Sequence, residues 1–189
     1  MCLFWTALNA DWRETLLARA VRVAELFRLN AVFFRFFNLM SAHPFTDYFR
    51  GFEKNDVIRQ LFGDRTEEVL DGLKIHFSWV GGYMGVNPSN GNLMVNPDYL
   101  RTGDKVDIYL DVIHELVHTR QWMDGKNLFE GGYRYVERPT EVEAYRYTVE
   151  EARRLGLSDE RICGYLKTEW MSDEDLRHLA KTLGVQSHQ

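Results

Sequence analysis

The sequence predicts a single domain of the α+β class, in which helices pack around a small antiparallel sheet. Apolar residues recur every three or four positions in residues 11–29, 104–123 and 139–155, a spacing typical of amphipathic helices. Between the first two of these segments, residues 73–96 alternate in a strand-like way and carry turn signals. The 189 residues contain no linker, repeat or low-complexity tract, so we expect one domain over residues 1–189.

A helical N-terminal part is expected over about residues 11–62. After its first helix, residues 32–40 predict a second helix or a continuation of the first. This segment ends at a Ser-Ala-His-Pro sequence, because the residue before a proline avoids the helical conformation. Residues 55–62 predict a short helix that Gly63 stops, whereas residues 66–70 favour no single structure.

The strand-like region predicts three short antiparallel strands. Residues 73–80 alternate between apolar and polar side chains, and a Gly-Gly pair follows them. Residues 83–87 form a second candidate strand and residues 93–95 a third. The turn between the second and third strands contains Asn90 and Gly91, a pair that tolerates positive φ at both positions.

Two longer helices and a helical C-terminal part complete the expected fold. Asp104 is a plausible N-cap for the helix over residues 104–123, which an Asp-Gly pair ends. Pro139 opens the next helix, and Gly156 stops it. A last helix is expected after Ser172, within a C-terminal helical part of about residues 157–184.

Composition narrows the environment and the partners. A net charge of −5 and a pI near 5.7 give no general attraction to nucleic acid, so we expect no nucleic-acid partner. The most apolar stretch, residues 23–40, contains Glu25 and Arg28 and is too polar for stable membrane insertion. Cys2 and Cys163 suggest reduced thiols and, with no secretory signal visible, a cytoplasmic location. The sequence does not specify an oligomeric state.

The segment from His114 to His118 reads His-Glu-Leu-Val-His, which is an H-E-x-x-H motif. In a helix, residues four apart lie about 40° from one another around the axis, so both imidazoles project from one face and can reach one cation. Glu115 lies about 60° beyond His118, displaced from the histidine row. That position suits a general base acting on a zinc-bound water.

A catalytic zinc ion normally takes three protein ligands and leaves a fourth position for water. The start of the helix after Pro139 offers Glu141 and Glu143 as third ligands. Thr140 and Glu143 have the spacing of a capping box, which would give Glu143 a structural role. Ala144, one turn beyond Glu141, lets two helices approach closely. We therefore favour Glu141 as the ligand and keep Glu143 as the alternative.

At these residues the chain resembles the gluzincin-type zinc metallopeptidases, which combine H-E-x-x-H with a glutamate on a later helix. The segment Glu141-Val142-Glu143-Ala144 resembles the E-x-x-A ligand helix of small members. The resemblance implies a zincin-like core over about residues 74–150, with Zn²⁺ held by His114, His118 and Glu141. It implies an edge strand, residues 93–95, lying over the motif helix. Where many relatives carry an acidic residue or asparagine that orients a metal histidine, this chain has Tyr145; either Tyr145 or Asp111 is expected to take that role.

These residues favour a zinc metallopeptidase that acts on a peptide or protein substrate, with Glu115 as the catalytic base. The candidates for stabilising the oxyanion are Tyr133, Tyr135, Tyr145 and Arg146. One alternative is a regulatory or binding module on a zincin scaffold with little or no proteolysis. Another is a structural zinc site with four protein ligands, using His76 or both glutamates.

Overall fold

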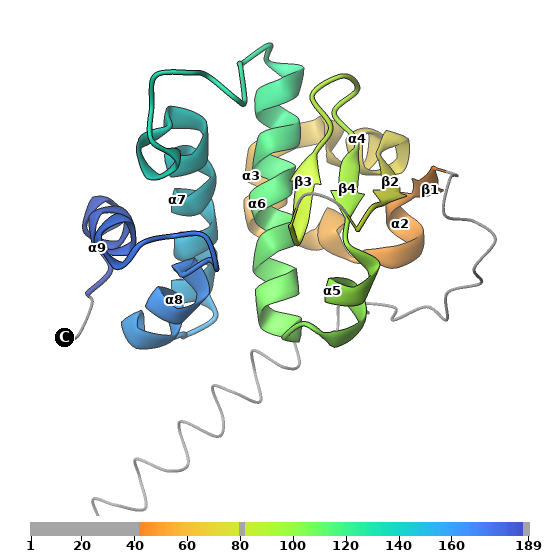
Figure 1. Cartoon of the computed structure of the whole chain (residues 1–189). Coiled ribbons are helices and arrows are strands. Elements are labelled where there is room, and N and C mark those ends of the chain that lie inside the picture. Colours follow the sequence, from red (N-terminus) through yellow and green to blue (C-terminus); the bar gives the residue numbers. More distant parts are fainter. Residues whose placement is uncertain (1–41, 80–81, 187–189) are drawn as a thin grey trace, which may run out of the picture.

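The structure is a computed structural model that describes residues 42–79 and 82–186. The helices expected at residues 11–29 and 32–40, and Cys2, lie outside the described residues. The described part is α+β, as predicted. It contains a small four-stranded sheet and helices on both sides of one central helix, α6 (Lys105–Met123). In Figure 1 the sheet lies on one side of α6, and α7 (Pro139–Arg154) lies on the other.

The sheet is mixed, so the prediction of an antiparallel sheet was wrong. Its order is β1 (His43–Pro44), β2 (Lys74–Phe77), β4 (Leu93–Val95) and β3 (Met84–Val86). β2 pairs parallel with β4, whereas β1 with β2 and β3 with β4 pair antiparallel. The reason is that β4 lies between β2 and β3. The chain forms β2, then β3 at the edge, and then returns through the β3–β4 hairpin, so that β4 pairs with β2 in the parallel direction.

The expected edge position of residues 93–95 was also wrong. β4 is an interior strand, and Leu93 and Val95 are fully buried, as suits a strand paired on both sides. The edge strands of the described sheet are β1 and β3, and β3 packs against α6. The β3–β4 turn is fixed to α6 by a hydrogen bond from the Trp122 indole to the carbonyl of Pro88, 2.9 Å long. Gly91 has a φ of 71° and contacts the same indole, where a Cβ would lie 2.4 Å from a ring carbon.

Four short α-helices lie before α6 in the described part of the chain. They are α2 (Phe45–Tyr48), α3 (Asp56–Phe62), α4 (Thr66–Gly72) and α5 (Pro97–Thr102). The sequence favours no single structure for residues 66–70, where α4 lies, and does not predict α5. In the structure the Asn96 side chain caps α5 by accepting from two backbone amides, and Pro97 occupies the first helical position.

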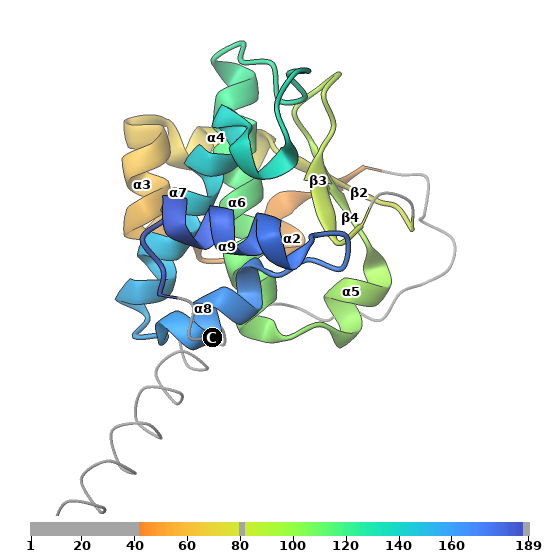
Figure 2. The ribbon, with the colours of Figure 1, turned by 60° about the vertical axis from the view of Figure 1, so that its left-hand side comes forward.

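The helices beyond α7 are α8 (Asp159–Leu166) and α9 (Asp173–Thr182). Asp104, Asn55 and Ser172 cap α6, α3 and α9 with their side chains. The cap at Asp104 was predicted, and α9 begins directly after Ser172, as expected. In the view of Figure 2, α9 crosses in front of α7 and α6, with α8 below it.

A buried polar network holds α7 against α6 and α3. The Tyr109 hydroxyl on α6 donates to Glu151 Oε1 on α7 at 2.5 Å, and Asn55 donates its amide to the Tyr109 oxygen at 2.6 Å. Arg154 clamps the same carboxylate with two hydrogen bonds of 2.6 and 2.7 Å. Glu151 is fully buried and Ala144 on the same helix is also fully buried, so the two helices lie in close contact along their length.

Candidate metal centre

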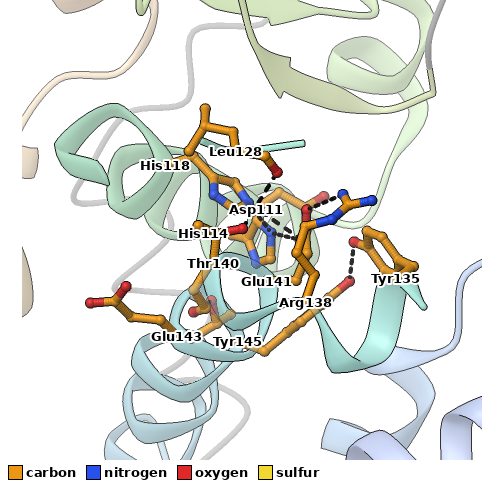
Figure 3. Close-up of polar contacts among 12 residues, drawn as sticks. Asp111, His114, His118, Leu128, Tyr135, Arg138, Thr140, Glu141, Glu143 and Tyr145 are labelled. Atoms are coloured by element: carbon orange, nitrogen blue, oxygen red, sulfur yellow. Dashed lines mark hydrogen bonds and ion pairs between the residues drawn. The ribbon is translucent and has the colours of Figure 1, made fainter. Parts of the chain in front are cut away.

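The structure brings together the three residues predicted to hold a metal. His114 and His118 project from one face of α6, and Glu141 faces them from the first turn of α7 (Figure 3). The Nε2 atoms of the two histidines are 3.0 Å apart, and each lies 3.4 Å from Oε2 of Glu141. All three residues are buried. Among the residues that the structure describes, they form the one group of histidine, cysteine and acidic side chains that could hold a metal ion.

The size of this triangle fits a small tetrahedral cation. Zinc bonds of about 2.0–2.1 Å to nitrogen or oxygen place two tetrahedral ligand atoms about 3.3 Å apart. The edges of the triangle are 3.0, 3.4 and 3.4 Å. Glu141 Oε2 is buried and forms no hydrogen bond, although it lies near both imidazoles. Three donor atoms therefore converge on one point, and hydrogen bonding leaves the carboxylate oxygen unsatisfied.

Gln121, which the sequence analysis missed, fixes the orientation of His118. Its Oε1 lies 2.7 Å from His118 Nδ1. Its Nε2 donates to the carbonyl of Thr140 at 2.9 Å and to Glu143 Oε2 at 2.8 Å, so the amide cannot be flipped without losing both bonds. Because an amide oxygen only accepts, Nδ1 of His118 carries the hydrogen and Nε2 is left to face the metal position. Gln121 lies three residues after His118, a spacing from which this contact could have been predicted.

Glu143 points away from the triangle, so Glu141 is the one of the two candidate glutamates that faces the histidines. Its carboxylate accepts from Gln121 and from Lys126 Nζ at 2.7 Å. The predicted capping box does not form, because Arg138 is the N-cap residue and Pro139 is the first helical residue. Thr140 therefore lies inside the helix, and its hydroxyl donates to the carbonyl of Leu128.

Arg138 holds the other oxygen of the ligand carboxylate. One of its guanidinium nitrogens lies 3.6 Å from Glu141 Oε1, and its side chain is mostly buried. The contact leaves Glu141 Oε2 facing the two histidines (Figure 3). Arg138 thus positions the carboxylate and offsets part of its charge.

The charges of the triad are strongly coupled. Burial raises the pKa of Glu141, but the two imidazoles outweigh this and hold it well below its usual range. Burial lowers the pKa of His118, but the Glu141 and Glu115 carboxylates outweigh this and raise it to about 9. Burial lowers the pKa of His114. A positive charge on the imidazoles and the negative charge of Glu141 therefore stabilise one another, and a bound metal ion would compete with protons for the same ligand atoms.

Glu115 lies beside the triad at the wall of a cavity of about 360 Å³ that His114 also lines. The side chain is 8% exposed, and its Oε2 has no hydrogen-bond partner. Burial raises the pKa of this carboxyl to about 8. A cation bound beside Glu115 would favour the ionised form of this carboxyl, which is the form that can accept a proton.

The two residues expected to orient a metal histidine make other contacts. Asp111 accepts hydrogen bonds from the Tyr99 and Tyr165 hydroxyls. The Tyr145 ring packs edge-on against His114, with 4.4 Å between ring centroids, and its hydroxyl lies 3.0 Å from that of Tyr135. No described residue forms a hydrogen bond with His114 Nδ1, so neither candidate orients His114 in this way.

Of the four candidates for stabilising the oxyanion, two line the cavity beside Glu115 and two do not. Tyr135 and Tyr145 line the cavity together with Glu115. Tyr133 is 47% exposed, and Arg146 lines a different groove, beside Glu143. His76 lies on β2 and is not part of the metal-binding group found among the described residues.

In the part of the chain that the structure describes, no helix is both long enough and apolar enough to cross a membrane. No family model matches the chain, and comparisons with curated proteins and with solved structures find no similar protein. Function is therefore inferred from the geometry of the site.

Proposed function

We propose that the protein is a zinc-dependent hydrolase that cleaves peptide bonds, with His114, His118 and Glu141 as zinc ligands and Glu115 as the catalytic base. The observation that carries the proposal is the buried triangle of Nε2, Nε2 and Oε2 atoms, with edges of 3.0–3.4 Å, beside a glutamate that lines a cavity. A catalytic site needs three fixed ligands and an accessible reacting position.

The chemistry of the donor atoms favours zinc among the common divalent ions. Two imidazoles and one carboxylate are a recurrent ligand set of catalytic zinc, whereas calcium and magnesium select oxygen ligands. The triangle also has the dimensions of one face of a tetrahedron around zinc. The fold already holds these atoms in place through Gln121 and Arg138.

When bound, zinc would supply Lewis acidity that activates a water and polarises the substrate carbonyl. Glu115 would accept the proton of that water at its free Oε2 and return it to the leaving amine. Tyr135 and Tyr145, whose hydroxyls are 3.0 Å apart, can donate a hydrogen bond to the carbonyl oxygen as its negative charge develops. All three side chains line the same cavity.

The test is the Glu115→Gln variant. It should bind zinc as the wild type does in elemental analysis and lose at least about 1,000-fold in hydrolysis of a quenched-fluorescent peptide library, because the amide cannot accept the proton. Glu143→Gln is the matched control, since it removes a nearby carboxylate outside the triangle and should keep most of the activity. Undiminished hydrolysis by Glu115→Gln would rule out this mechanism.

One observation supports the alternative of a binding module with little proteolysis. The segment between α8 and α9 contacts Tyr83, which precedes β3: Trp170 packs against the Tyr83 ring, and the Tyr83 hydroxyl donates to Glu169 at 3.1 Å. Tyr83 and Trp170 both line the cavity, so these contacts limit access from that side. A Glu169→Ala, Trp170→Ala variant distinguishes the two functions, because only a hydrolase would gain turnover of long peptides when these contacts are removed.

A further inference from the structure

The cavity beside Glu115 has a wall of aromatic rings that the proposed chemistry leaves largely unexplained. His114 and Glu115 contribute the edge nearest the metal centre. Half of the other lining residues are aromatic: Tyr83, Tyr99, Tyr135, Tyr145, Tyr165 and Trp170. The faces of such rings carry negative electrostatic potential, so rings that surround one space attract a cation.

Some of the charged side chains in the same wall form ion pairs and others do not. Asp107 forms an ion pair with Arg161, and Lys167 forms one with Asp173 at 2.9 Å. Asp111 forms no ion pair with any lysine, arginine or histidine in the described part of the chain. Within the described residues, Asp111 and Glu115 are therefore the carboxylates of this wall without an ion pair, and the proposed chemistry uses only Glu115.

Asp111 is held for contact with a ligand. The Tyr99 hydroxyl donates to its Oδ2 at 2.5 Å, and the Tyr165 hydroxyl donates to its Oδ1 at 2.8 Å. These two bonds fix the carboxylate from α5 and α8, and each oxygen keeps a further lone pair, since an ionised carboxylate has about four acceptor sites. A buried carboxylate without a cation is costly, and a cationic ligand would offset that cost.

Asp111 lies close to Glu115, the proposed catalytic base. It lies four residues before Glu115 on α6, so the two side chains share one face of the helix and lie about 6 Å apart along its axis. Glu115 lines the same cavity. A side chain that enters the cavity from a residue beside the cleaved bond could therefore reach Asp111.

We propose that this cavity is a specificity pocket for a lysine or arginine side chain next to the cleaved bond, held by the Asp111 carboxylate and the surrounding rings. The proposal rests on the proposed hydrolase function. It gives the substrate class as peptides with a basic residue beside the scissile bond.

The test measures binding without turnover. The full-length chain, kept metal-free with a chelator, is titrated by calorimetry with two capped pentapeptides that differ only in a central lysine or a central norleucine. We expect the lysine peptide to bind at least about tenfold more tightly, because only it can form the charged contact. Equal binding of the two peptides, or no binding of either, would overturn the proposal.

Two variants locate the preference. Asp111→Asn should abolish the lysine preference, whereas Asp107→Asn, one turn earlier and already paired with Arg161, should keep it to within about threefold. A lysine preference that survives in Asp111→Asn would also overturn the proposal. If that variant fails to fold, the two-peptide comparison on the wild type still decides. Neither measurement uses zinc or hydrolysis, so failure of the pocket and failure of the catalytic proposal are distinguishable.

Discussion

Replacing Gln121 with leucine tests the network that prepares the metal site. Leucine has a similar size but cannot accept the hydrogen of His118 Nδ1, which lies 2.7 Å from the amide oxygen. Residues that orient a metal histidine typically contribute 10- to 100-fold to metal affinity, so we expect zinc affinity to fall by about 1.4–2.7 kcal/mol. The loss should exceed that from Lys126→Met, which removes the other partner of Glu143 but does not touch His118.

The assay is competition for zinc with a chromophoric chelator at fixed pH, together with thermal unfolding of the metal-free chains. Gln121 also donates to the Thr140 carbonyl, so the leucine variant should lose about 1–3 kcal/mol of stability even without metal. That loss can be separated from the change in affinity by working well below the unfolding temperature. Zinc affinity within twofold of the wild type in a folded Gln121→Leu chain would refute the assigned role.

Three further predictions follow from the geometry of the site. Glu141→Gln should reduce zinc affinity more than about 100-fold and Glu143→Gln by less than about threefold, measured with the same chelator; the reverse order would make Glu143 the ligand. Burial raises the pKa of Asp111 to about 6 from 3.8, so the stability that its proton contributes is present below pH 4 and lost as the pH rises through 6. The free energy of unfolding of Asp111→Asn relative to wild type should therefore rise by up to about 3 kcal/mol between pH 4 and 7 in urea titrations, and a pH-independent difference would contradict this. Removal of zinc by a chelator should abolish hydrolysis while leaving the far-ultraviolet circular dichroism unchanged, whereas collapse of the helical signal would indicate a structural zinc site.

The sequence predicted the two helices that carry the metal centre because their signals are local. The start of α6 depends on the Asp104 side chain, which accepts from the amides of Val106 and Asp107 within the first turn. The start of α7 depends on Pro139 at the first helical position. Once both helices are correct, the spacing of His114 and His118 follows from the helical repeat.

The sheet could not be predicted in the same way, because its pairing is not local. The alternation in residues 73–96 indicates strands but does not specify which strands are neighbours. β2 and β4 become parallel partners through contacts such as Ile75 with Leu93, which are 18 residues apart in sequence. The partners of Glu143 are also non-local: its carboxylate binds Gln121 and Lys126, which lie on or just after α6.

The way α7 is attached to α6 bears on whether the metal organises the fold or only uses it. The Tyr109–Glu151 hydrogen bond and the two Arg154 contacts fix α7 about three turns from Glu141, and they involve no metal ligand. Gln121 adds a second attachment beside the triad through the Thr140 carbonyl. Because these contacts hold the two helices independently of a cation, the free energy of metal binding is not needed to assemble the site. A fold that keeps Glu141 buried opposite two imidazoles, with its Oε2 unpartnered, therefore offers a preorganised group that could hold a metal ion, as the proposed hydrolase requires.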